Sequence, residues 1–134
     1  MLLLLAVSAC KEEEPAKQIG SGPARLALEL AELRYEFVDG RHKYHHIRRY
    51  VESAGTGVTL EAGKVCVENG KACLSARVVY RINGASNLTQ PNHHVATRLA
   101  EDDITIEYWG TDDAGNDVRV EKRLHVAGEK IRVE

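Results

Sequence analysis

The sequence predicts an all-β fold, an antiparallel sandwich of about seven strands in one small domain. In several segments apolar and polar residues alternate with period two, as in strands that have one face in a core and the other in water. Residues that favour turns, mainly Gly, Asn, Asp and Pro, separate these segments. Short strands divided by frequent turns are typical of two packed sheets.

Residues 1–23 are predicted to contain a signal peptide, a lipid anchor and a tether. An apolar start ends in Val7-Ser8-Ala9-Cys10, which resembles the lipobox of bacterial lipoproteins, whose cysteine carries the lipid. The resemblance implies a signal peptide over 1–9, with its true start upstream, and a lipidated Cys10 in the bacterial cell envelope, at the outer membrane facing the periplasm or the surface. A buried first strand with a chance cysteine is the alternative. Residues 10–23, charged and then rich in Gly, Ser and Pro, are expected to form a flexible tether.

The sandwich is expected over residues 24–134, and its first strand falls in a segment of ambiguous spacing, 26–37. Leucine and aromatic residues recur there at helical intervals, but also at two-residue intervals with one slip. The all-β context favours a strand with a β-bulge at the slip over a helix. The two sets with strand spacing are Leu26, Leu28 and Leu30, then Leu33, Tyr35 and Phe37.

A disulfide-linked hairpin is predicted around Asn69-Gly70. Asn-Gly is a strong signal for a two-residue hairpin turn, because both residues tolerate positive φ. A turn there places Cys66 opposite Cys73, at a separation that a disulfide can span. Assigning Cys10 to lipid leaves two cysteines for an oxidising compartment, which favours this pair over free thiols or metal ligands.

The remaining strands are predicted by alternation, with turns between them. The acidic residues Glu101-Asp102-Asp103 are expected to form a solvated turn. The acidic segment 112–117 lacks the EF-hand pattern, so a hairpin turn is favoured there over a calcium site. The strands are expected at 74–82, 95–99, 104–109 and 118–126, and the turns at Gly55-Thr56-Gly57, Ala62-Gly63, Asn83-Gly84, Gln90-Pro91-Asn92 and Asp113-Ala114-Gly115-Asn116.

Residues 104–116, Ile-Thr-Ile-Glu-Tyr-Trp-Gly-Thr-Asp-Asp-Ala-Gly-Asn, and the alternating strand after them resemble the end of bacterial immunoglobulin-like domains. In that family a strand with a tyrosine leads through a T-D-x-A-G-N type of turn into the final strand. The resemblance implies an immunoglobulin-like β-sandwich used for adhesion, spacing or docking rather than for catalysis.

Histidines form the one unusual polar group. His42, His45 and His46 lie in a basic segment, and His93-His94 are expected in a loop after Pro91-Asn92. If the two clusters meet, they supply three or four imidazoles for Zn²⁺ or Cu²⁺. The alternative is a basic surface whose histidines only gain charge in acid. No cofactor is predicted.

Candidate contacts for a partner come from two segments. Trp109 is the only tryptophan, and the alternation of its strand places it on the outward face, where it would serve as an anchor for a partner. A covering loop or a bulge that turns it inward is the alternative. In the basic segment, Tyr44, Arg48 and Tyr50 are further candidates.

Motifs for the main classes of enzyme are missing from the sequence. It has no glycine-rich phosphate loop and no G-x-S-x-G elbow, and its net charge of −2 with an envelope location disfavours nucleic acid as a partner. We therefore expect a non-catalytic docking module that is held to the membrane by lipid and binds an envelope or surface protein. A periplasmic metal-binding lipoprotein and an inhibitor of an envelope enzyme are the alternatives.

Overall fold

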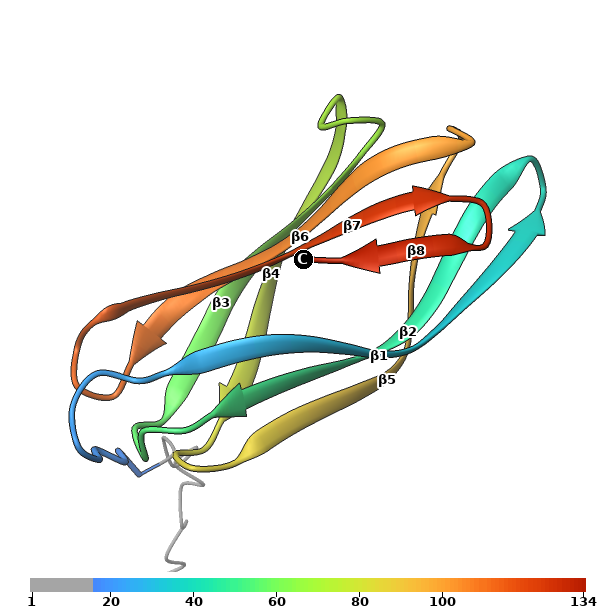
Figure 1. Ribbon diagram of the computed structural model, residues 1–134. Coiled ribbons are helices and arrows are strands. Elements are labelled where there is room, and N and C mark those ends of the chain that lie inside the picture. Colours follow the sequence, from blue (N-terminus) through green and yellow to red (C-terminus); the bar gives the residue numbers. More distant parts are fainter. Residues whose placement is uncertain (1–15) are drawn as a thin grey trace, which may run out of the picture.

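The computed structural model describes residues 16–134, which form two antiparallel β-sheets packed as a sandwich (Figure 1). This confirms the all-β prediction, with eight strands in the described part of the chain. Residues 16–134 include no helix long and apolar enough to cross a membrane. The smaller sheet has the order β1-β2-β5 and the larger one β4-β3-β6-β7-β8. The strands are β1 (Leu26–Val38), β2 (Arg41–Glu52), β3 (Val58–Val67), β4 (Ala72–Ile82), β5 (Asn87–Thr97), β6 (Glu101–Asp112), β7 (Asp117–Ala127) and β8 (Lys130–Val133).

The connections between strands gather at two ends of the sandwich (Figure 1). The proximal end, against which the segment 16–24 lies, comprises the connections 53–57, 83–86 and 113–116. The distal end comprises the connections 39–40, 68–71, 98–100 and 128–129.

Residues 26–38 form a bulged strand, as the spacing predicts, and not a helix. The register with β2 shifts between Ala31, which is paired with Ile47, and Arg34, which is paired with His45. Between these two pairs, Glu32 has a φ of 53°, a left-handed conformation that accommodates the extra residue of a bulge. The bulge lets the leucines before it and Tyr35 after it pack against the same core.

Several expected turns and loops lie inside strands instead. Ala62-Gly63 is part of β3, where a Cβ on Gly63 would overlap the ring of Tyr108, so this glycine marks close packing and not a chain reversal. Gln90-Pro91-Asn92 is part of β5, where Asn92 has a φ of 64° and the register with β2 shifts. His93-His94 therefore lies in a strand rather than in a loop, and 101–103 begins β6 rather than forming a turn.

The predicted hairpin and disulfide are confirmed. Cys66 faces Cys73 across β3 and β4, and the two residues form a disulfide with a Cα–Cα distance of 4.1 Å. Asn69 and Gly70 both have positive φ, and the amide of Lys71 donates to the carbonyl of Glu68, 3.1 Å away. The turn chemistry thus sets the register that brings the two cysteines together.

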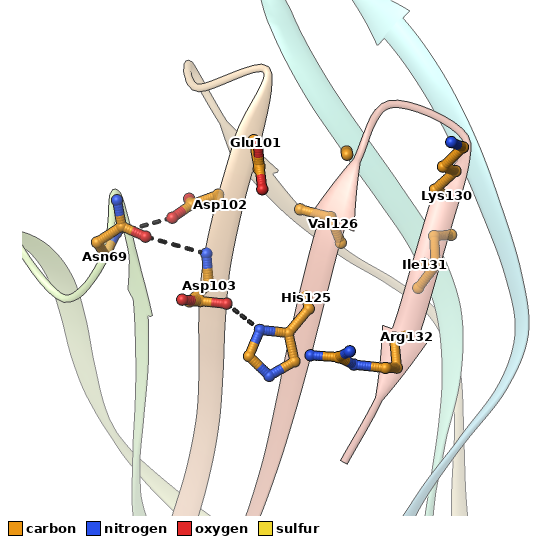
Figure 2. A pocket seen from close by; sticks show the side chains of 10 residues that line it. Asn69, Glu101, Asp102, Asp103, His125, Val126, Lys130, Ile131 and Arg132 are labelled. Atoms are coloured by element: carbon orange, nitrogen blue, oxygen red, sulfur yellow. Dashed lines mark hydrogen bonds and ion pairs between the residues drawn. The ribbon is translucent and has the colours of Figure 1, made fainter.

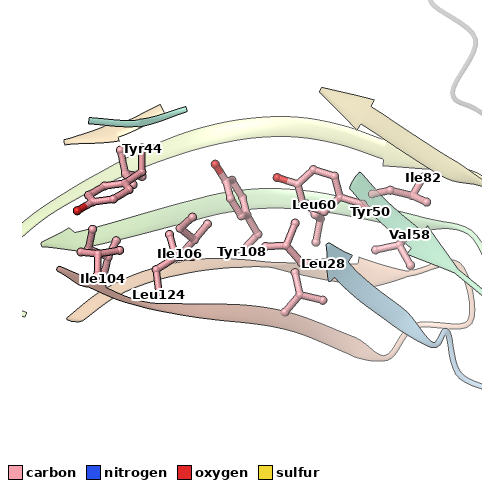
Figure 3. Packing of buried hydrophobic residues seen from close by; sticks show 13 residues of the cluster. Leu28, Tyr44, Tyr50, Val58, Leu60, Ile82, Ile104, Ile106, Tyr108 and Leu124 are labelled. Carbon is pink, nitrogen blue, oxygen red and sulfur yellow. The ribbon is translucent and has the colours of Figure 1, made fainter. Parts of the chain in front are cut away.

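The core lies between the sheets and is continuous along the sandwich (Figure 3). Buried tyrosines bridge the two layers: the ring of Tyr50 meets that of Tyr108 edge to face, with centroids 5.7 Å apart. The Tyr44 hydroxyl donates to the carbonyl of Gly128 at 2.9 Å. The buried apolar cluster comprises Leu28, Tyr44, Tyr50, Val58, Leu60, Ile82, Val95, Ile104, Ile106, Tyr108, Val120, Leu124 and Val126.

Residues 18–21, which the sequence assigns to the tether, are hydrogen-bonded to the proximal end. The backbone of Gln18 donates to the Asp113 carboxylate at 2.7 Å and accepts from the amide of Gly57 at 2.9 Å. The amide of Gly20 donates to the Thr56 hydroxyl at 2.9 Å. The signal peptide 1–9 and Cys10 lie outside the described residues.

Candidate docking site

The smaller sheet leaves part of the larger sheet's inner face uncovered near the distal end. Ile106, Val65 and Leu74 are register partners on β6, β3 and β4, so their side chains share one face. Exposure rises along this row: Ile106 is 0% exposed, Val65 is half-buried and Leu74 is 77% exposed. The strand of the smaller sheet nearest to this side is β5, which touches β4 in only a few places. The apolar face of the β3–β4 hairpin therefore extends past the layer that should cover it.

A groove of about 370 Å³ runs between this hairpin and β5. Most of the residues that line it are apolar, and the charged or titratable ones among them are Arg41 and His94. Cys73, which is bonded to Cys66, is a lining residue next to Leu74. The lining residues are Arg41, Val65, Val67, Ala72, Cys73, Leu74, His94, Val95 and Ala96.

Two further apolar side chains are exposed on the outer face of the larger sheet. Trp109 is 37% exposed, as the alternation of its strand predicts, and is paired with Ala62 on β3 and Arg119 on β7. Val79 is 83% exposed at a bulge of β4. Neither side chain lines the groove.

The other three predicted partner contacts are buried, which corrects their assignment to a surface. Tyr44 and Tyr50 are fully buried in the core, and Arg48 is 3% exposed. Alternation along β2 puts all three on the inner face of the smaller sheet. The Arg48 guanidinium donates from Nη1 to the Tyr108 hydroxyl at 2.7 Å. Because Arg48 lies in a basic segment, it was expected in solvent. Its burial is tolerated because its guanidinium is hydrogen-bonded.

The two histidine clusters meet, but on opposite faces of the smaller sheet. His45 faces His94 across β2 and β5, with ring centroids 5.9 Å apart, on the outer face. His46 faces His93, with centroids 6.2 Å apart, on the inner face. His42 lies further along β2, with Nδ1 2.7 Å from the Tyr35 hydroxyl. The other four histidines of the two clusters are among the residues that line a hollow of about 400 Å³. Residues 16–134 nevertheless contain no group of three or more His, Cys, Asp or Glu arranged for a metal.

The inner pair is held neutral. Burial, together with the nearby charge of Arg48, lowers the pKa of His46 to about 4. Burial and Arg48 likewise lower the pKa of His93 to about 4. His46 accepts at Nε2 from Arg48 Nε, 3.0 Å away, and donates from Nδ1 to the Tyr44 carbonyl, 3.1 Å away. Both ring nitrogens of His46 are therefore occupied, which leaves none for a metal ion.

A second hollow of about 610 Å³ lies at the distal end between the β3–β4 turn, β6 and β8 (Figure 2). His125 bonds to Asp103 through Nδ1, and its Nε2 lies 3.2 Å from a carboxylate oxygen of Glu134. Asp102, which is buried, accepts from the amide of Asn69 at 2.7 Å and so holds the hairpin turn. No serine, threonine or cysteine is among the lining residues, so this cleft places no hydroxyl or thiol nucleophile beside its histidine.

Sequence reasoning missed the groove beside Leu74 and the distal hollow that contains His125. Leu74 and Val95 occupy inward positions of alternating strands, and such positions are ordinarily covered. The pairing of Asp103 with His125 needs the β6–β7 register, which no local pattern reports.

The sequence matches no protein-family model and no curated protein. The fold is similar to that of a solved structure, the crystal structure of the putative ApaA protein from Bordetella pertussis. The two share 7% sequence identity with a TM-score of 0.57, over 83% of this chain and 93% of that one. At this identity the similarity supports a shared β-rich architecture only.

Proposed function

We propose that this protein is a docking module of the bacterial cell envelope, held at the membrane through a lipidated Cys10 and binding another protein without catalysis. The observation that carries the proposal is the groove beside Leu74, where apolar side chains of an inner sheet face meet solvent. Contiguous apolar surface in a soluble domain is typical of a protein interface. The motif at 104–116 supports assigning the sandwich to the immunoglobulin-like class.

The positions of the two ends support this proposal. The N-terminal segment leaves the domain at the proximal end, whereas the groove and the β3–β4 turn lie at the distal end (Figure 1). A lipid tether at the proximal end would therefore present the groove away from the membrane. An inhibitor of an envelope enzyme is the same proposal with an enzyme as the partner.

Location and binding need separate tests. In the full-length precursor, Cys10→Ser should move the protein from the membrane fraction to the soluble fraction. If the variant stays on the membrane like the wild type, the lipid anchor is wrong. For binding, the wild-type protein should retain one saturable partner from envelope extract, and either Leu74→Ser or Trp109→Ala should lower the amount retained. Retention that neither variant changes contradicts the docking role.

A second candidate is a periplasmic metal-binding protein, favoured by the outer histidine pair. His45 and His94 face each other closely enough to share one Zn²⁺ or Cu²⁺ after small rotations, and a Glu36 carboxylate oxygen lies 3.3 Å from His45 Nε2. Calorimetry with either metal should show severalfold weaker binding for His45→Ala and for His94→Ala, with His42→Ala as the control. Millimolar affinity, or affinity that no variant changes, contradicts this candidate.

A further inference from the structure

We infer that the groove receives an extended segment of the partner protein, which adds to β5 as a fourth strand of the smaller sheet and which is apolar with acidic ends. This inference rests on the proposed docking function and names the chemistry of the partner. It rests on the sheet geometry, on the state of the strand edges and on the charge of the groove.

The first argument is the place that a fourth strand would take. The smaller sheet has three strands and the larger sheet five, and no strand within 16–134 pairs with the side of β5 that faces away from β2. A strand added there would lie over the β3–β4 hairpin. Its inward side chains would then cover Val65 and Leu74, the two residues of the inner row that are not fully buried.

The second argument is that the edge strands β1 and β8 are protected against such pairing. β8 is only four residues long, and β1 carries a bulge and several charged residues. β5 itself contains Pro91 and the Asn92 bulge, which block pairing over that half of the strand. The remaining half, 93–97, has no such feature, and it is the half that lines the groove.

The third argument is charge complementarity. Arg41 is the charged residue among those that line the groove, and no Asp or Glu is among them. An acidic residue at the end of the added strand would pair with Arg41 at the distal end of β2. Apolar residues at alternate positions would face the hairpin, because successive side chains of a strand point to opposite faces.

The test uses synthetic peptides and the full chain with Cys10→Ser, which keeps it free of lipid. The probe is the peptide Glu-Val-Thr-Val-Thr-Val-Glu. Its controls are the same peptide with lysine ends and the same peptide with serine in place of valine. Fluorescence anisotropy gives the affinities, and amide chemical shifts locate the site. We expect the acidic valine peptide to bind best and to shift the amides of 93–97.

Two matched variants locate the contact. Leu74→Ser should weaken binding of the acidic peptide about tenfold, which corresponds to about 1.4 kcal/mol. Val79→Ser removes an equally exposed apolar side chain that does not line the groove, so it should leave the affinity unchanged. Arg41→Glu should reverse the preference between the acidic and the lysine peptides.

Three results would overturn the inference. The acidic valine peptide could bind no better than its controls, or Val79→Ser could weaken it as much as Leu74→Ser does. Sedimentation could instead show a wild-type dimer that Leu74→Ser dissociates, in which case a second copy fills the groove. If no peptide binds, but Trp109→Ala still lowers the retention of an envelope partner, the docking function is supported and only the assignment of the groove is wrong. If no partner is retained and Cys10→Ser leaves the protein on the membrane, the proposed function itself fails.

Discussion

The two ends of the sandwich differ in how their connections are held. At the proximal end, buried carboxylates accept hydrogen bonds from loop amides: Glu52 accepts from five backbone N–H groups, and Asp112 from three. Asp113 there forms a two-point ion pair with Arg81 at 2.7 Å. At the distal end Asp102 is the one carboxylate among the described residues that accepts in this way from turn amides. It also lines the hollow of about 610 Å³.

This difference has a physical consequence. A buried loop amide without a partner costs free energy, so a carboxylate that accepts several of them fixes the loop in one conformation. The distal end is shaped instead by strands of the larger sheet that extend past the smaller one, which leaves apolar surface open. The end that would face the membrane is therefore closed by polar bonds, and the opposite end is available for contact.

The largest expected effect is at Glu52. Glu52→Ala leaves five loop amides without their acceptor and should lower the free energy of unfolding by about 4 kcal/mol. The amides belong to Arg25, Ala54, Gly55, Thr56 and Ala85. Urea unfolding measures the change, and the exposed Glu61→Ala is the control. A loss below about 1 kcal/mol would mean that these bonds do not hold the proximal end.

Acid should destabilise the protein in two successive ranges. In the native state the pKa values of His46 and His93 are lowered to about 4. As the pH falls from 6.5, these histidines therefore become protonated in the unfolded chain before they do so in the native state. The free energy of unfolding falls over that range. Burial alone would raise the pKa of Glu52, but hydrogen bonds from loop amides lower it, so stability is lost further as its carboxylate becomes protonated.

The measurement is urea unfolding at several pH values. His93→Gln removes one of the two titrating rings and should flatten the dependence of stability on pH between 6.5 and 4, by an amount on the order of 1 kcal/mol or more. His94→Gln, on the outer face, is the control. An unchanged slope in His93→Gln would show that this ring is not held neutral in the native state.

A smaller effect is expected at the disulfide of the distal end. Replacing both Cys66 and Cys73 by serine should cost about 2 kcal/mol, because the bond closes a short loop. The β3–β4 register should survive, since Asn69-Gly70 sets it independently. Urea unfolding measures the cost. Thiol labelling of the unreduced wild type should find neither cysteine free, and labelling of either one would contradict the bond.

The smallest effect on stability is expected at Trp109. Because its ring is partly in solvent, Trp109→Ala should change the free energy of unfolding by less than about 1 kcal/mol, whereas truncation of a buried aromatic costs about 3–5 kcal/mol. Thermal unfolding separates the two cases. A loss in the upper range would show that Trp109 is a core residue and would remove it from the docking surface.

Much of the fold could be predicted because its signals are local. The slip in leucine spacing located the β1 bulge, the Asn69-Gly70 turn fixed the cysteine pair, and alternation put Trp109 outward. Each depends on φ preferences or on the two-residue period of a strand, which a short segment sets by itself. The turns predicted at Gly63 and Pro91 were wrong, because glycine and proline also occur in strands, at sites of close packing and at bulges.

The sequence by itself determined the all-β class, the register of the stapling hairpin and the residues that alternate inward or outward along each strand. Only the tertiary structure decided that β5 ends the smaller sheet, that Leu74 consequently meets solvent, and that Tyr44, Arg48 and Tyr50 lie in the core. The reason is that a strand's alternation defines two faces but does not say what lies against either of them. Coverage depends on the number of strands in the opposite sheet, and that number follows from pairings between residues far apart in the chain.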